Sequence, residues 1–183
     1  MSAAPGSPGQ AGIPSGGAGA NMYAIKPIEY LISERPLVVR RRVKWGECDP
    51  AGVVYTATFA DYVIAAAELF YGALFGTTPQ LAKSEQQFGT PSRALSFDFL
   101  RSLRPDEEFD MTVRVAEVRS RTYVLDIAAT TPQGEAVFNA RLTPVCVARP
   151  ERRSIDIPPA FRQALLDYQR DCGAPTTIQE ETP

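Results

Sequence analysis

A long apolar segment, 59–75, constrains the fold of this chain more than any other feature of its sequence. The segment (FADYVIAAAELFYGALF) combines strong helix formers with apolar side chains on nearly all sides, and only Asp61 and Glu68 carry charge. A helix that is apolar all round is normally buried inside a protein. With 17 residues, two of them charged, the segment is short for a membrane span. We therefore predict a long helix in the core.

Strand-like alternation of apolar and polar side chains flanks this segment in the sequence. One run precedes it at 37–45, and four follow it, at 94–103, 109–118, 122–131 and 136–148. Pro132-Gln133-Gly134 is typical of a hairpin link, and Pro144 predicts an edge position or a bulge in the last run. Helical spacing predicts a terminal helix at 159–170. This order predicts an α+β fold, with an antiparallel sheet wrapped round the central helix.

The two ends of the chain differ in composition from the part between them. Residues 1–21 are mostly Gly, Ala, Ser and Pro, and residues 174–183 are mostly polar. Such segments bury too little apolar surface to offset their ordering entropy, so we expect two loose tails around one folded domain, 22–173. The predicted sheet leaves an edge strand and a helix flank exposed. Pairing with a second copy covers both, so we expect a homodimer, with a dimer of dimers (homotetramer) as the larger assembly.

Composition excludes several kinds of chemistry. The 183 residues contain no histidine, which excludes Ser-His-Asp and Cys-His catalytic devices and His-ligated zinc. The net charge of -2 gives no basic excess for binding nucleic acid or a membrane surface. Three scattered cysteines (Cys48, Cys146 and Cys172) predict reduced thiols rather than disulfides or a metal site. The N-terminal segment has no basic residue before Lys26 and no compact apolar core, so we expect no secretory signal and a cytoplasmic protein.

The turn ahead of the helical segment holds the best candidate for chemistry. Asp49-Pro50-Ala51-Gly52 has the residue types of a type I turn, and Thr58-Phe59-Ala60-Asp61 is similar to a capping box at the start of a helix. A carboxylate near free helix N–H groups can activate water while the N–H groups bind an oxyanion. The simpler interpretation, that Asp49 only caps its turn, is equally open because Asp-Pro turns are common.

The charged neighbours of this turn have two interpretations each. Glu47 is expected to be solvated, with a second catalytic role as the alternative. Cys48 has no His or Lys neighbour to lower its pKa, so we expect an inert thiol. Two groups of arginines are either solvated strand ends or phosphate ligands, since guanidinium binds two oxygens at once. These groups are Arg119 with Arg121, and Arg149 with Arg152 and Arg153.

Four segments resemble the 4-hydroxybenzoyl-CoA thioesterase family, in the family's order and at about its spacing. They are 44–55 (KWGECDPAGVVY), 89–91 (GTP), 117–123 (EVRSRTY) and 131–134 (TPQG). The resemblance covers nearly the whole folded part, from Arg40 to Tyr168. It implies the hot-dog fold and an acyl-CoA thioesterase that hydrolyses an aromatic or other small acyl-CoA. It implies no metal and no organic cofactor.

The resemblance also implies roles for single residues. Asp49 matches the catalytic aspartate, which acts as nucleophile or general base, and Thr56 matches the residue whose backbone N–H polarises the thioester carbonyl. Thr56 replaces an aromatic residue of the family, and residues 57–60 replace Pro-Asn-Tyr-His of its prototype, so the pocket wall differs. The implied substrate contacts are Tyr55, Thr58, Thr90, Arg119, Arg121 and Arg152.

Other functions on the same fold remain as alternatives. A hydratase or dehydratase would resemble families that rely on a catalytic histidine, and this chain has none. A non-catalytic module would bind acyl-CoA or an acyl carrier protein without releasing a thiol. A thioesterase that acts on an acyl carrier protein would release one from that partner instead of from CoA.

Overall fold

The structure, a computed structural model, describes residues 27–85, 87–149 and 151–173. Both predicted tails, 1–21 and 174–183, lie outside this part of the chain. The elements run in the order β1 (Glu29–Glu34), β2 (Leu37–Arg42), a 3-10 turn (Trp45–Glu47), α1 (Thr58–Phe75), α2 (Pro79–Glu85), β3 (Phe88–Gly89), β4 (Ser92–Phe99), β5 (Glu108–Val118), β6 (Tyr123–Thr130), β7 (Ala136–Pro144), β8 (Val147–Ala148) and α3 (Pro159–Cys172).

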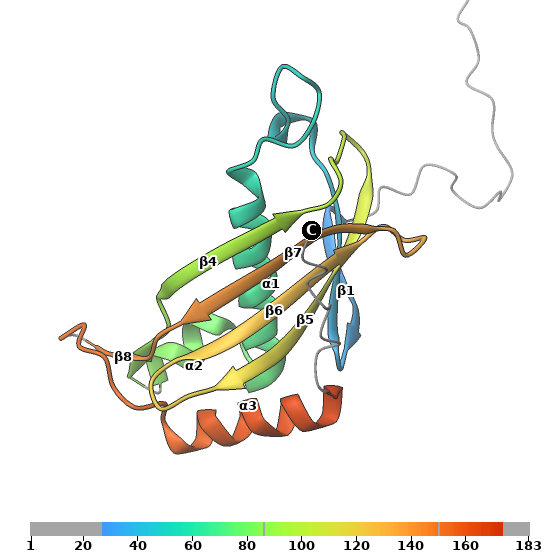
Figure 1. Ribbon diagram of the computed structural model, residues 1–183. Helices are drawn as coiled ribbons and strands as arrows, with labels where there is room; N and C mark the ends of the chain where they lie inside the picture. The colour runs from blue at the N-terminus through green and yellow to red at the C-terminus, as the bar shows by residue number, and fades with distance from the viewer. Residues whose placement is uncertain (1–26, 86, 150, 174–183) are drawn as a thin grey trace, which may run out of the picture.

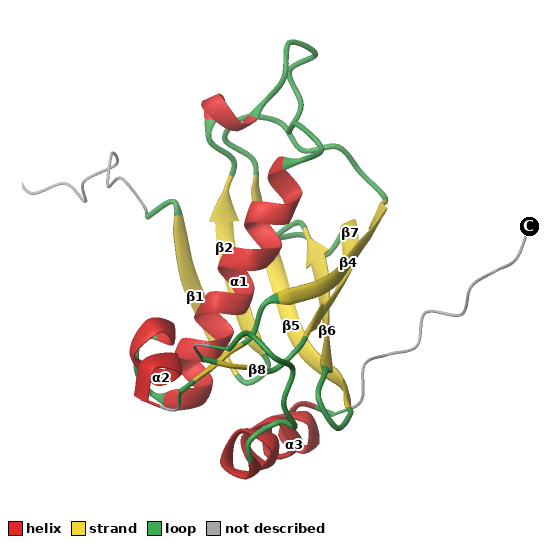
Figure 2. Cartoon of the chain, turned by 90° about the vertical axis from the view of Figure 1, so that its left-hand side faces the viewer, coloured by secondary structure: helices red, strands yellow, loops and turns green. Residues whose placement is uncertain are grey.

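One antiparallel sheet of six strands carries the fold, in the order β1-β2-β5-β6-β7-β4. The sheet curves round α1, as Figures 1 and 2 show, so the predicted α+β arrangement is confirmed. A second, two-stranded sheet pairs β3 with β8. Of the two alternatives predicted from Pro144, the edge position is wrong, because β7 lies between β6 and β4. The bulge is confirmed, because Pro144 is the last residue of β7, where the register with β4 shifts.

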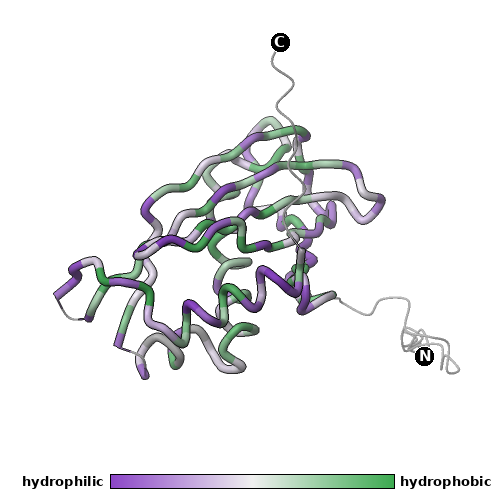
Figure 3. Tube along the Cα trace, turned by 60° about the horizontal axis from the view of Figure 1, so that its bottom comes forward, coloured by the Kyte–Doolittle hydropathy of each residue, from purple (hydrophilic) through white to green (hydrophobic). Residues whose placement is uncertain are grey.

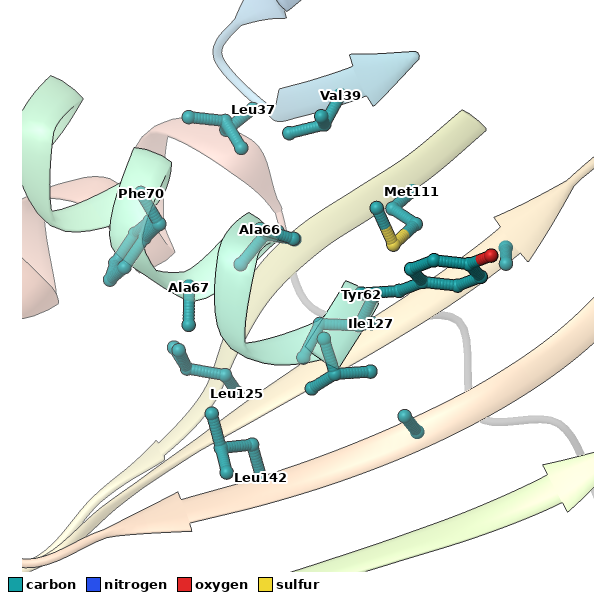
Figure 4. Close-up of a cluster of buried hydrophobic side chains, with 14 of the residues drawn as sticks. Leu37, Val39, Tyr62, Ala66, Ala67, Phe70, Met111, Leu125, Ile127 and Leu142 are labelled. Carbon is teal, nitrogen blue, oxygen red and sulfur yellow. The ribbon is translucent and has the colours of Figure 1, made fainter. Parts of the chain in front are cut away.

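Helix α1 buries one face against the sheet. Figure 4 shows Tyr62 beside Met111 of β5, and Tyr62, Ala66 and Phe70 are all fully buried. The expectation that α1 is buried on every side is wrong, since Asp61 and Glu68 face solvent. By length and composition alone α1 could cross a membrane, but its buried face is part of this core. The helix ends at Gly76, whose φ of 64° is the left-handed conformation that glycine adopts readily.

The C-terminal end of α1 is closed by α3. Phe161 of α3 contacts the rings of Tyr71, Phe88 and Tyr123, at centroid distances of 6.4, 5.2 and 5.4 Å. Farther along α3, the Tyr168 hydroxyl donates to the carbonyl oxygen of Val113 at 2.8 Å. Hydrophobic and hydrophilic residues alternate along α3 in Figure 3, as expected for a helix with one buried face. This end of the molecule is therefore a packed aromatic core.

Candidate active site

The loop between β2 and α1 forms the predicted type I turn. The N–H of Gly52 donates to the Asp49 carbonyl oxygen at 2.9 Å, and Gly52 has a φ of 77°. The Asp49 N–H donates to Val53 at 2.9 Å, and Cys48 pairs with Val54 as an antiparallel bridge. The loop is therefore a small hairpin with regular hydrogen bonds.

The Asp49 carboxylate caps this turn with one of its oxygens. Oδ1 accepts the N–H of Ala51 at 2.8 Å, so the simpler interpretation of Asp49 is confirmed as far as it goes. No residue in the described part of the chain donates to Oδ2. The side chain is half-buried, which leaves this second oxygen available to a ligand or a water molecule. The capping bond orients the carboxylate and does not exclude a catalytic role.

Two backbone N–H groups at the start of α1 have no acceptor within the described residues: those of Thr56 and Ala57. The three N–H groups that follow are already used. Thr58 donates to Tyr55 at 2.9 Å, and Phe59 donates to Thr56 at 3.3 Å. Ala60 likewise donates to Ala57 at 3.2 Å. Free N–H groups at the positive end of a helix dipole can bind an oxyanion.

The predicted capping box at the start of α1 is wrong. The helix begins at Thr58 with Ala57 as its N-cap, and no side chain caps its N–H groups. The Thr58 hydroxyl instead donates to the Glu47 carbonyl oxygen at 3.5 Å. An N-cap hydroxyl at Thr58 would accept an N–H group two or three residues farther along the helix, so the N–H groups of Thr56 and Ala57 do not depend on a capping box. The error therefore leaves the candidate site unchanged.

Hydrogen bonds connect the Asp49 turn to the start of α1 through Glu47. The Glu47 carbonyl oxygen accepts the N–H of Tyr55 at 3.0 Å, besides the bond from Thr58. The Cys48–Val54 bridge follows immediately, and Asp49 is the next residue. Figure 2 shows this loop above the first turn of α1. The carboxylate and the exposed N–H groups thus belong to one connected piece of structure.

Glu47 is an ion-paired residue, and the expectation that it is solvated is wrong. Its carboxylate accepts hydrogen bonds from Arg41 at 2.7 Å, the Lys44 N–H at 2.7 Å and the Tyr62 hydroxyl at 2.8 Å. Burial alone would raise the pKa of Glu47, but these hydrogen bonds outweigh burial and lower the pKa below its usual value. Glu47 is therefore ionised and fully engaged.

An apolar wall of three rings adjoins the site; Phe99 is 45% exposed and open to a ligand, whereas Phe59 and Phe138 are buried. Phe59 lies in the first turn of α1 and packs against Phe99 and Phe138 at ring distances of 5.0 and 5.3 Å. Two aromatic residues flank the turn in solvent: Trp45 is 86% exposed and Tyr55 is 58% exposed. Tyr55 and Thr58, both predicted substrate contacts, follow the Asp49 turn and donate to the Glu47 carbonyl oxygen.

The other predicted substrate contacts lie at the opposite end of α1. Thr90 is held near that end, where its buried hydroxyl lies by those of Tyr71 and Tyr123 without good hydrogen-bond geometry to any described residue. From Thr58 to Tyr71 the helix rises about 20 Å, at ~1.5 Å per residue. A single chain therefore does not bring Thr90 to Asp49.

Two of the five candidate phosphate ligands are already paired. Glu117 binds the guanidinium of Arg119 through two hydrogen bonds, of 2.8 and 2.7 Å, and Asp156 binds Arg121 at 3.1 Å. Arg152 has no carboxylate partner among the described residues. The same holds for Arg149 and Arg153, which flank it beside β8. We call Arg149, Arg152 and Arg153 the basic corner.

Comparison with known proteins identifies the family. Residues 43–165 match the model of the thioesterase-like superfamily. The chain belongs to the thioesterase-like superfamily. No curated protein matches its sequence.

Solved structures show that this superfamily member has the hot-dog fold. The 1,4-dihydroxy-2-naphthoyl-CoA thioesterase of Synechocystis is 22% identical, with a TM-score of 0.64 over 71% of this chain and 95% of that one. A gentisyl-coenzyme A thioesterase is 21% identical, with a TM-score of 0.63 over 70% and 98%. A hypothetical protein of Staphylococcus aureus, solved in complex with CoA, is 14% identical, with a TM-score of 0.70 over 86% and 94%. The predicted fold and family are both confirmed.

Sequence reasoning missed two residues of the thioesterase-like site, Arg41 and Tyr62. Both bind the Glu47 carboxylate, one from β2 and the other from α1. Cys48, by contrast, is no rival to Asp49 as nucleophile. Partial burial and the charges of Glu47 and Asp49 raise the pKa of its thiol. Within the described ranges, no group of three His, Cys, Asp or Glu side chains could hold a metal ion.

Proposed function

We propose that this chain hydrolyses an acyl-CoA thioester, with Asp49 as the catalytic carboxylate and the N–H groups of Thr56 and Ala57 as the oxyanion donors. One observation carries the proposal. A half-buried carboxylate with a free oxygen belongs to a hairpin that is hydrogen-bonded to the uncapped start of a helix. The superfamily membership supports the same activity.

Two routes use this geometry. As a general base, Asp49 removes a proton from water, whose oxygen attacks the thioester carbon while the N–H groups hold the developing oxyanion. As a nucleophile, Asp49 attacks that carbon itself and forms a mixed anhydride, which water then hydrolyses. In both routes the carbon–sulfur bond breaks, and the thiolate of CoA leaves and takes up a proton. Single turnover in oxygen-18 water labels Asp49 only in the nucleophilic route.

An aromatic or other small acyl group fits the site best. The apolar wall of Phe59, Phe99 and Phe138 presents one ring to a ligand, that of Phe99, and adjoins the helix start where the carbonyl would bind. Two of the solved structures with this fold are described as thioesterases of aromatic acyl-CoA substrates. An aromatic ring gains edge-to-face contacts with such a wall beyond those of an alkyl chain.

A homodimer through β4 explains how the two distant groups of predicted residues serve one ligand. β4 is an unpaired edge of the sheet, with Leu95, Phe97 and Phe99 on one face and no lysine or proline within it to block pairing. Two-fold pairing of β4 with its copy is antiparallel, so the start of one strand lies beside the end of the other. The basic corner lies near the start of β4, and Phe99 at its end contacts Phe59 beside the Asp49 turn. The partner's basic corner is thereby brought toward Asp49, where it would bind the phosphates of CoA.

The proposal is tested with Asp49→Asn and Asp49→Ala, assayed for thiol release with Ellman's reagent over a panel of aromatic, short-chain and long-chain acyl-CoAs. Both variants should lower turnover by about 10²-fold to 10⁴-fold while the protein stays folded. Asp106→Asn is the matched control, because Asp106 is an exposed turn aspartate whose side chain makes no hydrogen bond within the described residues. Full activity in both Asp49 variants would remove Asp49 from the mechanism. Binding of acyl-CoA without thiol release by the wild type would support the non-catalytic module, and release only from an acyl carrier protein would change the substrate.

A further inference from the structure

The Glu47 carboxylate joins three parts of the molecule. One oxygen accepts Nη2 of Arg41 from β2 at 2.7 Å and lies 3.1 Å from Nζ of Lys44. The other oxygen accepts the backbone N–H of Lys44 at 2.7 Å and the hydroxyl of Tyr62 from α1 at 2.8 Å. A single side chain thus connects the sheet, the helix and the segment that leads into the Asp49 turn.

This cluster is nearly closed to solvent. The side chains of Glu47 and Arg41 are 11% and 12% exposed. Arg41 also donates to Glu29 of β1 at 2.6 Å, and its guanidinium lies 4.5 Å from the centre of the Tyr62 ring. Hydrogen bonds to charged groups in such surroundings are stronger and more directional than those at the surface. The cluster therefore holds its members in fixed positions.

The backbone of Glu47 completes the connection. Its carbonyl oxygen accepts the Tyr55 N–H at 3.0 Å and the Thr58 hydroxyl at 3.5 Å. Tyr55 and Thr58 flank the two residues whose N–H groups are free, and Asp49 is two positions beyond Glu47. The same residue thus fixes the strand that leads into the Asp49 turn and the segment that leaves it.

We propose that Glu47 is a positioning residue, which fixes the Asp49 turn relative to the N–H groups at the start of α1 through its bonds to Arg41, Tyr62, Tyr55 and Thr58. It is not a catalytic residue, because all its contacts are structural and none is left for substrate. The inference rests on the proposed function, in which those two groups act on one thioester. Misplacing a catalytic group by about 1 Å can cost on the order of 10²-fold in rate. Loss of the Glu47 charge should therefore lower kcat and leave KM nearly unchanged.

Glu47→Gln tests this inference, because it keeps the size of the side chain and removes its charge. We expect kcat to fall about 10-fold to 100-fold, with KM changing less than about 3-fold. Tyr62→Phe, which removes one bond to Glu47, should lower kcat in the same direction by a smaller factor. Asp110→Asn is the matched control. Asp110 binds Arg40, the neighbour of Arg41 on β2, through two hydrogen bonds and is 14% exposed, but it lies on the other face of the sheet.

A second measurement separates this inference from the proposed function. Amide hydrogen exchange of residues 48–57 reports the order of the loop whether or not the protein hydrolyses acyl-CoA. Glu47→Gln should speed exchange there, whereas Asp110→Asn should not. Unchanged exchange in Glu47→Gln would overturn the role of Glu47 and leave Asp49 in place. So would an unchanged kcat in Glu47→Gln when Asp49→Asn is inactive. If the wild type hydrolyses no thioester, faster exchange still supports the positioning of the loop by Glu47.

Discussion

The two ends of α1 each carry a tyrosine whose hydroxyl ties the helix to another element, but the surroundings are opposite. Near the N-terminal end, Tyr62 donates to the ionised Glu47 at the rim of the molecule. Toward the C-terminal end, the Tyr71 hydroxyl bonds to that of Tyr123 inside the core. The first pair adjoins a loop with a half-buried carboxylate, and free N–H groups follow that loop. The second pair is sealed by aromatic packing against α3.

The difference shows how one helix separates chemistry from stability. At the closed end, burial raises the pKa of Tyr71 to about 12 and holds the pKa of Tyr123 well above its usual value, so both hydroxyls stay neutral. At the open end, burial and the negative charge of Glu47 raise the pKa of Tyr62, which stays a donor. A neutral, packed end can supply stability, while a charged, hydrogen-bonded end can hold functional groups in solvent.

The strongest test of this division is Phe161→Ala at the closed end. Phe161 is fully buried and contacts four other aromatic rings, so its removal should lower the free energy of unfolding by about 3–5 kcal/mol. The folded variant should keep the kcat of the wild type, because the Asp49 turn lies about 20 Å away along the helix. Urea unfolding and steady-state kinetics at low temperature measure the two effects. A loss of kcat as large as that of stability would show that the two ends are not separate.

The basic corner provides the next test, since it lies at the closed end of its own chain. Arg152→Glu with Arg153→Glu should raise KM for an acyl-CoA by about 10-fold or more, roughly 1.4 kcal/mol per tenfold, and leave kcat nearly unchanged. Co-expression with Asp49→Asn sharpens the comparison. If the partner's basic corner serves each Asp49, mixed dimers contain one intact site and, at acyl-CoA concentrations below the raised KM, regain activity that neither variant reaches alone. If no activity is recovered, Asp49 and the basic corner of the same chain serve one site, or only one of these two groups contributes to activity.

The sequence predicts the fold better than it predicts the difference between the two ends of α1. Residues 59–75 predict α1 because their composition allows little else, and the alternation of β5 and β6 is regular. β1 was missed because EYLISE is mostly half-exposed and has a glutamate at each end, which weakens its alternation. α2 and the two-residue strands β3 and β8 are too short to leave a pattern.

The sequence predicted only part of the candidate site, for a physical reason. Asp49 was found because its turn is local, with every partner within four residues. The partners of Glu47 lie on other elements, Tyr62 being 15 residues away, so the sequence around Glu47 suggests a solvated residue. Arg121 is paired with Asp156, 35 residues away, which no local pattern indicates. Contacts that depend on how elements pack become visible only in the folded chain.

The smallest expected effect is a change in the acid dependence of stability. The lowered pKa of Glu47 means that its ionised form contributes stability above about pH 4.5, its usual value, and that this contribution is lost as the pH falls through the folded-state pKa. Glu47→Gln cannot titrate at this position. The gap in unfolding free energy between wild type and variant should therefore be constant from pH 7 to about pH 5.5 and narrow below about pH 4.5. Glu107, whose pKa is also lowered despite partial burial, by Arg101 and the Arg104 N–H, titrates in both proteins and cancels in the comparison. Urea titrations at several pH values measure the gap, and a gap that widens in acid would mean that Glu47 is not held as a charged group at the open end.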